Sequence, residues 1–156
     1  MREFLHKEID IVLVAITSPI QIGIYKNDKL IKVIKSSEKA SEFLPKVFSE
    51  LLHKYKIRSI VYARGPGSFM AIKLTYIFLK TLSLAKNIEI KACDAFVFSK
   101  NLPIKAVGNL YFIKKGDKIE VQKIKNGRKN EFYLPEKISD ILFSENLEPL
   151  YILPAV

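Results

Sequence analysis

The sequence predicts an α/β protein whose first part has the element order βββαβαβ. Two observations carry the start of this order: residues 9–16 form a near-continuous apolar, β-branched run, and residues 20–36 form two alternating runs around Asn27 and Asp28. The first pattern is typical of a buried central strand, and the second is typical of a hairpin. With 156 residues, of which 49% are hydrophobic, the chain is long enough to bury one core.

The other elements of this part follow in order along the chain. A helix is expected to start near Ser41, because apolar residues recur there at helical spacing and leave one buried face. These residues are Phe43, Leu44, Val47, Phe48, Leu51, Leu52 and Tyr55. A short strand over 58–63, a turn, a long helix over 68–86 and a strand over 88–93 complete the order.

The pattern weakens in the second part of the chain. The expected elements are short strands over 104–108, 109–115 and 118–124, a helical stretch over 136–142 and a last apolar run over 149–153. A boundary is expected near residues 95–103, where Lys100, Asn101 and Pro103 cluster. It divides the chain into an N-terminal lobe, 1–98, and a reduced C-terminal lobe, 99–156.

Several classes of site are excluded by composition. Cys93 is the only cysteine, so no intrachain disulfide can form, and its apolar neighbours favour a buried residue over a nucleophile. His6 and His53 lie far apart without cysteine or carboxylate at ligand spacing, which argues against a zinc site and a Ser-His-Asp triad. No apolar run approaches the ~18 residues of a membrane span, and no signal peptide is recognised, so we expect a cytoplasmic protein.

The net charge is +10, and much of it lies in residues 100–137, which hold ten basic and four acidic residues. A solvated, lysine-rich surface and a nucleic-acid contact both explain this charge, although lysine greatly outnumbers the arginine that forks onto phosphates. The candidate nucleic-acid contacts are Lys105, Lys114, Lys115, Lys118, Lys123, Lys125, Arg128 and Lys129.

A loop with two glycines, Arg64-Gly65-Pro66-Gly67-Ser68-Phe69, joins the strand over 58–63 to the long helix. Pro66 fixes the first corner of a tight turn, Gly67 tolerates a positive φ at the second, and Ser68 can cap the helix. Free amides at such a helix start attract anions. The loop is not a Walker A motif, because no Lys-Ser or Lys-Thr pair follows the glycines, and spacing alone favours a structural turn.

The helix over 68–86 is apolar around most of its circumference, with Lys73 and Lys80 nearly in line with Asn87. One face of a sheet cannot cover so wide an arc. Either a neighbouring helix or a second chain is therefore expected to cover the rest, and we favour a partner interface. Its expected residues are Pro45, Phe48, Phe69, Met70, Lys73, Tyr76, Ile77 and Lys80.

The hexapeptide at 64–69 resembles part of the GPGSFTGxRxG signature of the TsaB (YeaZ) family, which acts in threonylcarbamoyladenosine formation on tRNA. The order βββαβαβ is similar to the first lobe of the actin-like, ribonuclease H-like superfold to which this family belongs. Residues 40–45 look like the family's first-helix segment, and residues 149–153 look like its C-terminal Pro-x-Tyr-Leu. The resemblance implies an actin-like first lobe with a reduced second lobe.

The chain also departs from the family pattern. The residues that differ from it are Lys39, Met70, Ala71, Lys73 and Thr75. The family's Asp-Thr-Ser after the first strand corresponds to Ile16-Thr17-Ser18, and Ile16 cannot help to hold a metal or phosphate as an acid at that strand end does in active members. With a shortened second lobe as well, no complete nucleotide cleft is expected.

The resemblance implies a non-catalytic subunit that pairs with a TsaD-type catalytic subunit through the first-lobe helices and forms a homodimer when isolated. ATP and metal are expected on the catalytic partner, with no cofactor or metal on this chain. A TsaE-type ATPase and tRNA are possible members of the full complex. Two other functions stay open: a basic RNA-binding accessory module, and a degenerate ATPase or protease, against which the missing acid and nucleophile–base pair argue.

Overall fold

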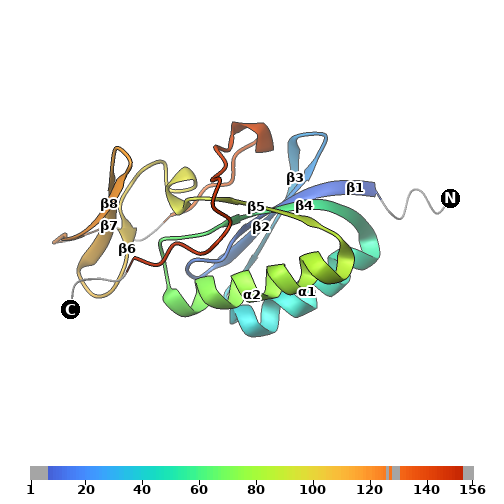
Figure 1. Ribbon diagram of the computed structural model, residues 1–156, viewed down its shortest axis with the longest axis horizontal. Helices are drawn as coiled ribbons and strands as arrows, with labels where there is room; N and C mark the ends of the chain where they lie inside the picture. The colour runs from blue at the N-terminus through green and yellow to red at the C-terminus, as the bar shows by residue number, and fades with distance from the viewer. Residues whose placement is uncertain (1–6, 126, 128–130, 153–156) are drawn as a thin grey trace.

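The computed structural model describes residues 7–125, 127 and 131–152, and its centre is a five-stranded mixed sheet (Figure 1). The strands are β1 (Lys7–Val14), β2 (Ile20–Lys26), β3 (Lys29–Ser36), β4 (Tyr55–Ala63) and β5 (Glu89–Cys93). They lie in the order β3-β2-β1-β4-β5, in which β1, β4 and β5 are parallel and β2 is antiparallel to β1 and β3. Both the α/β class and the order βββαβαβ are confirmed.

The central strand β1 is buried on both faces of the sheet. Ile9, Ile11 and Leu13 point to the core beneath the helices, and Val12 and Val14 point to the core on the opposite face. This arrangement explains why residues 11–14 of β1 are continuously apolar rather than alternating. The β2–β3 hairpin turns at Asn27 and Asp28, which have positive φ values of 49° and 72°.

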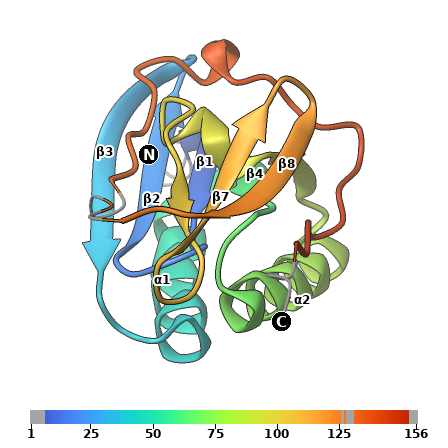
Figure 2. The same cartoon turned by 90° about the vertical axis from the view of Figure 1, so that its left-hand side faces the viewer.

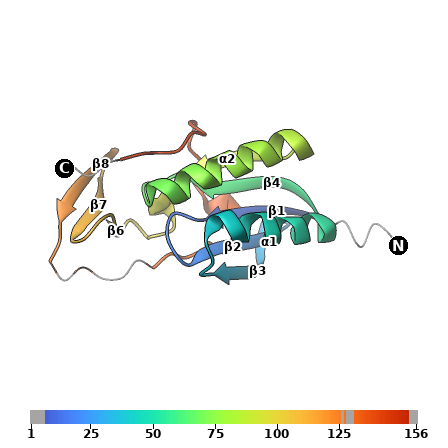
Figure 3. The same ribbon diagram turned by 90° about the horizontal axis from the view of Figure 1, so that it is seen from below.

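Two helices, α1 (Ala40–Lys54) and α2 (Phe69–Lys86), lie side by side on one face of the sheet (Figures 1 and 3). The predicted apolar stripe of α1 packs there, with Leu52 only partly buried. Tyr55 is the exception, since it ends α1 in an extended conformation and begins β4 beside Lys7, three residues earlier than expected. Among the described residues, no helix is long and apolar enough to cross a membrane.

A second sheet lies at the end of the first, beyond the carboxyl ends of β1 and β4 (Figure 1), and its β7–β8 hairpin faces the viewer in Figure 2. Its three antiparallel strands are β6 (Ile104–Lys105), β7 (Leu110–Lys115) and β8 (Lys118–Lys123). β6 is shorter than the strand expected over 104–108. Two 3-10 turns, η2 (Ala95–Val97) and η3 (Ile138–Asp140), are also present.

The prediction of a helix over 136–142 is wrong, because only the single 3-10 turn η3 forms there. Long-range hydrogen bonds hold this segment instead of a helical repeat. The amide of Ser139 donates to Asp28 Oδ1 at 2.7 Å, and its hydroxyl donates to Asp28 Oδ2 at 2.7 Å. These bonds also lower the pKa of the Asp28 carboxyl.

A second apolar core fills the face of the sheet opposite the helices. Val14 and Val61 of the sheet contribute to it, together with Phe96, Phe112 and Phe132 from later segments. The packing is therefore continuous across residue 98, and the division into lobes 1–98 and 99–156 stays a prediction.

Thr75 of α2 offers a test of the packing under this helix. Its side chain is buried, and its hydroxyl has no hydrogen-bond partner among the described residues. An unsatisfied buried hydroxyl costs free energy, so the isosteric change Thr75→Val is expected to raise the free energy of unfolding by about 1 kcal/mol in urea denaturation. The control is Thr81→Val on the exposed side of α2, which is expected to change stability by less than ~0.5 kcal/mol. Equal effects of the two changes would contradict the prediction.

Candidate partner surface and motif loop

The motif loop, residues 64–69, is packed against the end of β1. The amide of Ser68 donates to Ile16 O at 2.9 Å, and the carbonyl of Gly65 accepts from the amide of Ala95 at 2.8 Å. A Cβ on Gly67 would lie 2.6 Å from Ile16 Cβ, so glycine is needed there for lack of space. The prediction of a positive φ at Gly67 is wrong, because the positive φ, 126°, occurs at Gly65.

Ser68 is the N-cap of α2, as predicted. Its backbone is extended, and its hydroxyl oxygen accepts a long hydrogen bond, 3.5 Å, from the amide of Ala71. Since the Ser68 amide itself is bonded to Ile16, fewer amides are free at this helix start than the sequence suggested.

The C-terminal segment, residues 147–152, lies over the motif loop and the end of β4. The amide of Leu150 donates to Arg64 O at 2.7 Å, Arg64 Nε donates to Glu148 O at 2.7 Å, and the Tyr62 hydroxyl donates to Leu147 O. The ring of Tyr151 packs on Phe69 with 4.7 Å between centroids. Burial raises the pKa of the Tyr62 hydroxyl, which keeps it a neutral donor.

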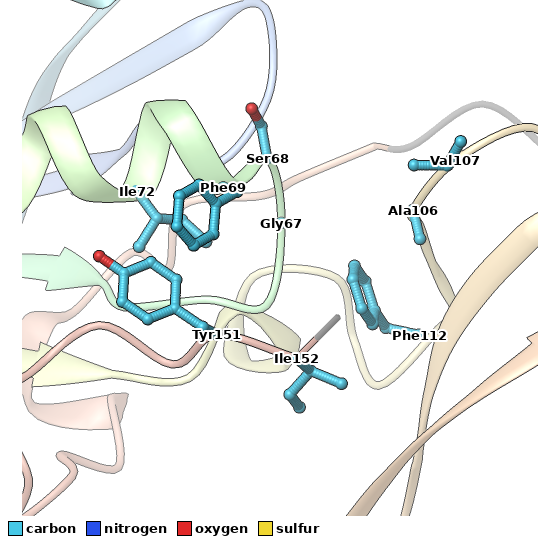
Figure 4. A pocket seen from close by; sticks show the side chains of 9 residues that line it. All are labelled: Gly67, Ser68, Phe69, Ile72, Ala106, Val107, Phe112, Tyr151 and Ile152. Carbon is cyan, nitrogen blue, oxygen red and sulfur yellow. The ribbon is translucent and has the colours of Figure 1, made fainter. Parts of the chain in front are cut away.

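A cavity of about 280 Å³ lies where the motif loop, the C-terminal segment and the second sheet meet (Figure 4). Its lining residues are Gly67, Ser68, Phe69, Ile72, Ala106, Val107, Phe112, Tyr151 and Ile152. No charged side chain is among them, and the strand end beside the loop is the apolar Ile16. Triphosphate and Mg²⁺ require cationic groups and carboxylates, so these residues do not fit the ATP and metal of the active actin-like proteins.

The outward side of α2 carries an exposed apolar row. We call Met70, Leu74, Ile77 and Leu84 the α2 stripe. Their offsets from Met70 are those of residues on one side of a helix, and Met70, Ile77 and Leu84 are 61%, 52% and 80% exposed. The exposed Lys73 and Lys80 border the stripe on the side away from α1. Leu74 and Leu84 were not among the predicted contacts. Their spacing of 4 and 14 residues from Met70 places them on the same side of the helix and could have identified them.

The rest of the apolar circumference of α2 is covered inside the chain. Phe78 packs on Phe48 of α1 with 5.5 Å between ring centroids, and Tyr76 packs on Tyr62 of β4 with 6.3 Å between ring centroids. The neighbouring helix α1 therefore covers one side of α2. The α2 stripe is left uncovered by the described part of the chain and stays the predicted contact with a second chain.

The predicted partner contacts differ in how far they are exposed. The prediction of Phe48 as a contact is wrong, because its side chain is fully buried between α1 and α2. Tyr76 is half-buried, and Phe69 is partly covered by Tyr151. Pro45 is exposed on α1 and stays a predicted contact, as do Lys73 and Lys80.

The basic residues of the second sheet do not form one free surface. Lys114 is only partly exposed and pairs with Asp94 at 2.7 Å, and it stays a predicted tRNA contact. Lys115 pairs with Glu120 at 3.4 Å. Lys105, Lys118, Lys123 and Lys125 are exposed, whereas the predicted contacts Arg128 and Lys129 lie outside the described residues.

Cys93 is buried, as predicted. Burial raises the pKa of its thiol to about 12, so the sulfur is protonated at neutral pH and unsuited to act as a nucleophile.

The chain matches no model of a known protein family and no curated protein. Among solved structures, it is similar to an uncharacterized protein with similarity to peptidase YeaZ from Pseudomonas aeruginosa, with a TM-score of 0.56 and 14% identity over 82% of this chain and 63% of that one. It is also similar to YeaZ from Pseudomonas aeruginosa, with a TM-score of 0.57 and 13% identity over 87% of this chain and 66% of that one. The chain thus has a YeaZ (TsaB)-like fold and spans just under two thirds of each of these structures.

Proposed function

We propose that the chain is a TsaB-type, non-catalytic subunit in threonylcarbamoyladenosine modification of tRNA, acting in the cytoplasm. It pairs with a TsaD-type catalytic subunit, which carries the ATP and metal, and a TsaE-type ATPase and tRNA join the full complex. The YeaZ-like fold and the RGPGSF loop support the family assignment. The apolar cavity beside that loop supports a role without nucleotide chemistry.

The α2 stripe is the observation that carries this proposal. Three of its four apolar side chains are more than half exposed, although the chain buries comparable residues elsewhere on α2. A row of this kind on a helix is typical of a protein–protein contact. Since Lys73 and Lys80 flank it, the best partner surface is an apolar groove with an acidic rim.

The proposal is tested by coexpression with the TsaD-type subunit of the same organism. We expect the two chains to copurify and to sediment as one species. If the folded chain shows no association with that subunit at micromolar concentrations, the proposed pairing is wrong.

Nucleotide binding gives a separate expected result. Because the apolar Ile16 stands at the end of β1 and the chain spans just under two thirds of the YeaZ structures, we expect the isolated chain to bind ATP weakly and not to hydrolyse it. Isothermal titration calorimetry with Mg-ATP measures the first expectation, and phosphate release measures the second. Micromolar affinity of the chain alone would contradict the prediction.

An accessory contact with tRNA is a second candidate function. The exposed Lys118, Lys123 and Lys125 lie on and just after β8, which is the edge strand of the second sheet. Phosphate contacts of this kind weaken steeply as salt rises. Binding of tRNA to the isolated chain that falls in this way would support the accessory role, and no binding at low salt would exclude it.

A further inference from the structure

A second cavity, of about 310 Å³, lies between the motif loop and the second sheet and is chemically different from the apolar one. The two cavities share no lining residue. Four charged side chains line this second cavity: Arg64, Asp94, Lys114 and Asp117. Leu142 and Phe143 are among its apolar lining residues.

Arg64 is the most constrained of these charged groups. Only 9% of the residue is exposed. Its amide donates to Cys93 O at 2.9 Å, its carbonyl accepts from Leu150, and its Nε donates to Glu148 O. The two terminal nitrogens of the guanidinium make no hydrogen bond to any described residue. Arg64 lines the cavity, and these nitrogens are not among the fully buried polar atoms, so a ligand in the cavity can reach them.

The charges around the cavity leave Arg64 without a counter-ion in the described part of the chain. Asp94 is compensated twice, by Lys114 at 2.7 Å and by the amide of Phe96 at 2.9 Å. Asp117 is exposed at the β7–β8 turn, where water solvates its charge. A buried cation held in this way favours an anionic ligand.

We propose that this cavity binds a small organic monocarboxylate with an apolar body. The paired terminal nitrogens of a guanidinium match the two oxygens of a carboxylate, and Leu142 and Phe143 supply apolar surface for the rest of the molecule. Inorganic phosphate has no apolar body, so it would contact the guanidinium but gain nothing from Leu142 and Phe143. This ligand site goes beyond the proposed partner role and does not depend on it.

The test is a titration of the isotope-labelled chain with 2-methylpropanoate, followed by nuclear magnetic resonance. We expect saturable shifts of the Arg64 Nε–H signal and of the Ser144 and Leu150 amides, and no such shifts with inorganic phosphate. Asp117→Asn removes a negative charge that repels the carboxylate ligand, and it is expected to tighten binding about threefold. Arg64→Lys loses the two-pronged contact and is expected to weaken binding at least about tenfold.

Two controls keep the result interpretable. Lys123→Gln changes an exposed charge that does not line the cavity, and it is expected to leave the affinity unchanged. Circular dichroism shows whether Arg64→Lys is folded, and if it is not, the Asp117→Asn arm decides alone. The proposal is overturned if the carboxylate causes no saturable shift, if phosphate binds equally well, or if Asp117→Asn does not tighten binding.

Discussion

Gly65→Ala is expected to destabilise the fold by about 3 kcal/mol or more, the largest stability effect of any change at the motif loop. Two causes act together. Gly65 has a φ of 126°, which L side chains rarely adopt, and an added Cβ would lie 2.5 Å from Leu150 O. That carbonyl belongs to the C-terminal segment, whose amide at Leu150 is bonded to Arg64. The Cβ therefore has to displace the segment or distort the loop, and urea denaturation measures the loss.

Gly116→Ala is the matched control for this change. Gly116 also has a positive φ, 60°, but an added Cβ there meets no atom within 4 Å. Its expected loss is about 1 kcal/mol, from backbone strain alone. The difference between the two variants measures the crowding against Leu150. Equal stability of Gly65→Ala and Gly116→Ala would show that the C-terminal segment is not held on the loop as described.

Ile77→Glu and Met70→Glu are each expected to weaken association through α2 by ~3 kcal/mol, or roughly a hundredfold, while the chain stays folded. Both side chains are exposed in the single chain, so the charge is tolerated until a partner removes water from it. Sedimentation measures the loss, both for the homodimer expected of the isolated chain and for the complex with the TsaD-type subunit.

Three further variants separate association from folding. Leu79→Glu places the charge in the core beneath α2 and is expected to unfold the chain. Tyr76→Glu breaks the packing on Tyr62 and is expected to destabilise the fold as well. Leu102→Glu, at an exposed apolar residue outside α2, is expected to change neither property. If Met70→Glu and Ile77→Glu both unfold the chain, or both associate like the parent, the α2 stripe is not the partner surface.

The first part of the fold could be predicted from sequence because its signals are local. The run over 9–16 is apolar on both faces since helices cover one and later segments cover the other. The hairpin depends on Asn27 and Asp28, which tolerate positive φ. The start of β4 was missed because Tyr55 continues the helical period of α1, whereas parallel pairing with Lys7 draws it into the sheet.

The second part has no comparable local signal. Residues 131–152 are held by scattered hydrogen bonds to groups distant in sequence, such as Gln21 Nε2 to Phe132 O at 3.1 Å and the Tyr25 hydroxyl to Pro135 O at 2.5 Å. Neither periodicity nor a turn motif encodes such bonds. For the same reason the charged cavity beside Arg64 could not be predicted, because its neighbours Lys114 and Asp117 come from another sheet.

The C-terminal cover also sets an order of events during synthesis. Arg64 is made 84 residues before Glu148, and Gln21 is made 111 residues before Phe132. The ribosome therefore releases the strands and helices of the first sheet before the segments that close its second face exist. A nascent chain that ends short of Phe132 leaves part of the apolar side of β1 and β4 uncovered. Completion of the second core therefore waits for contacts that are distant in sequence, and contacts of this kind slow folding.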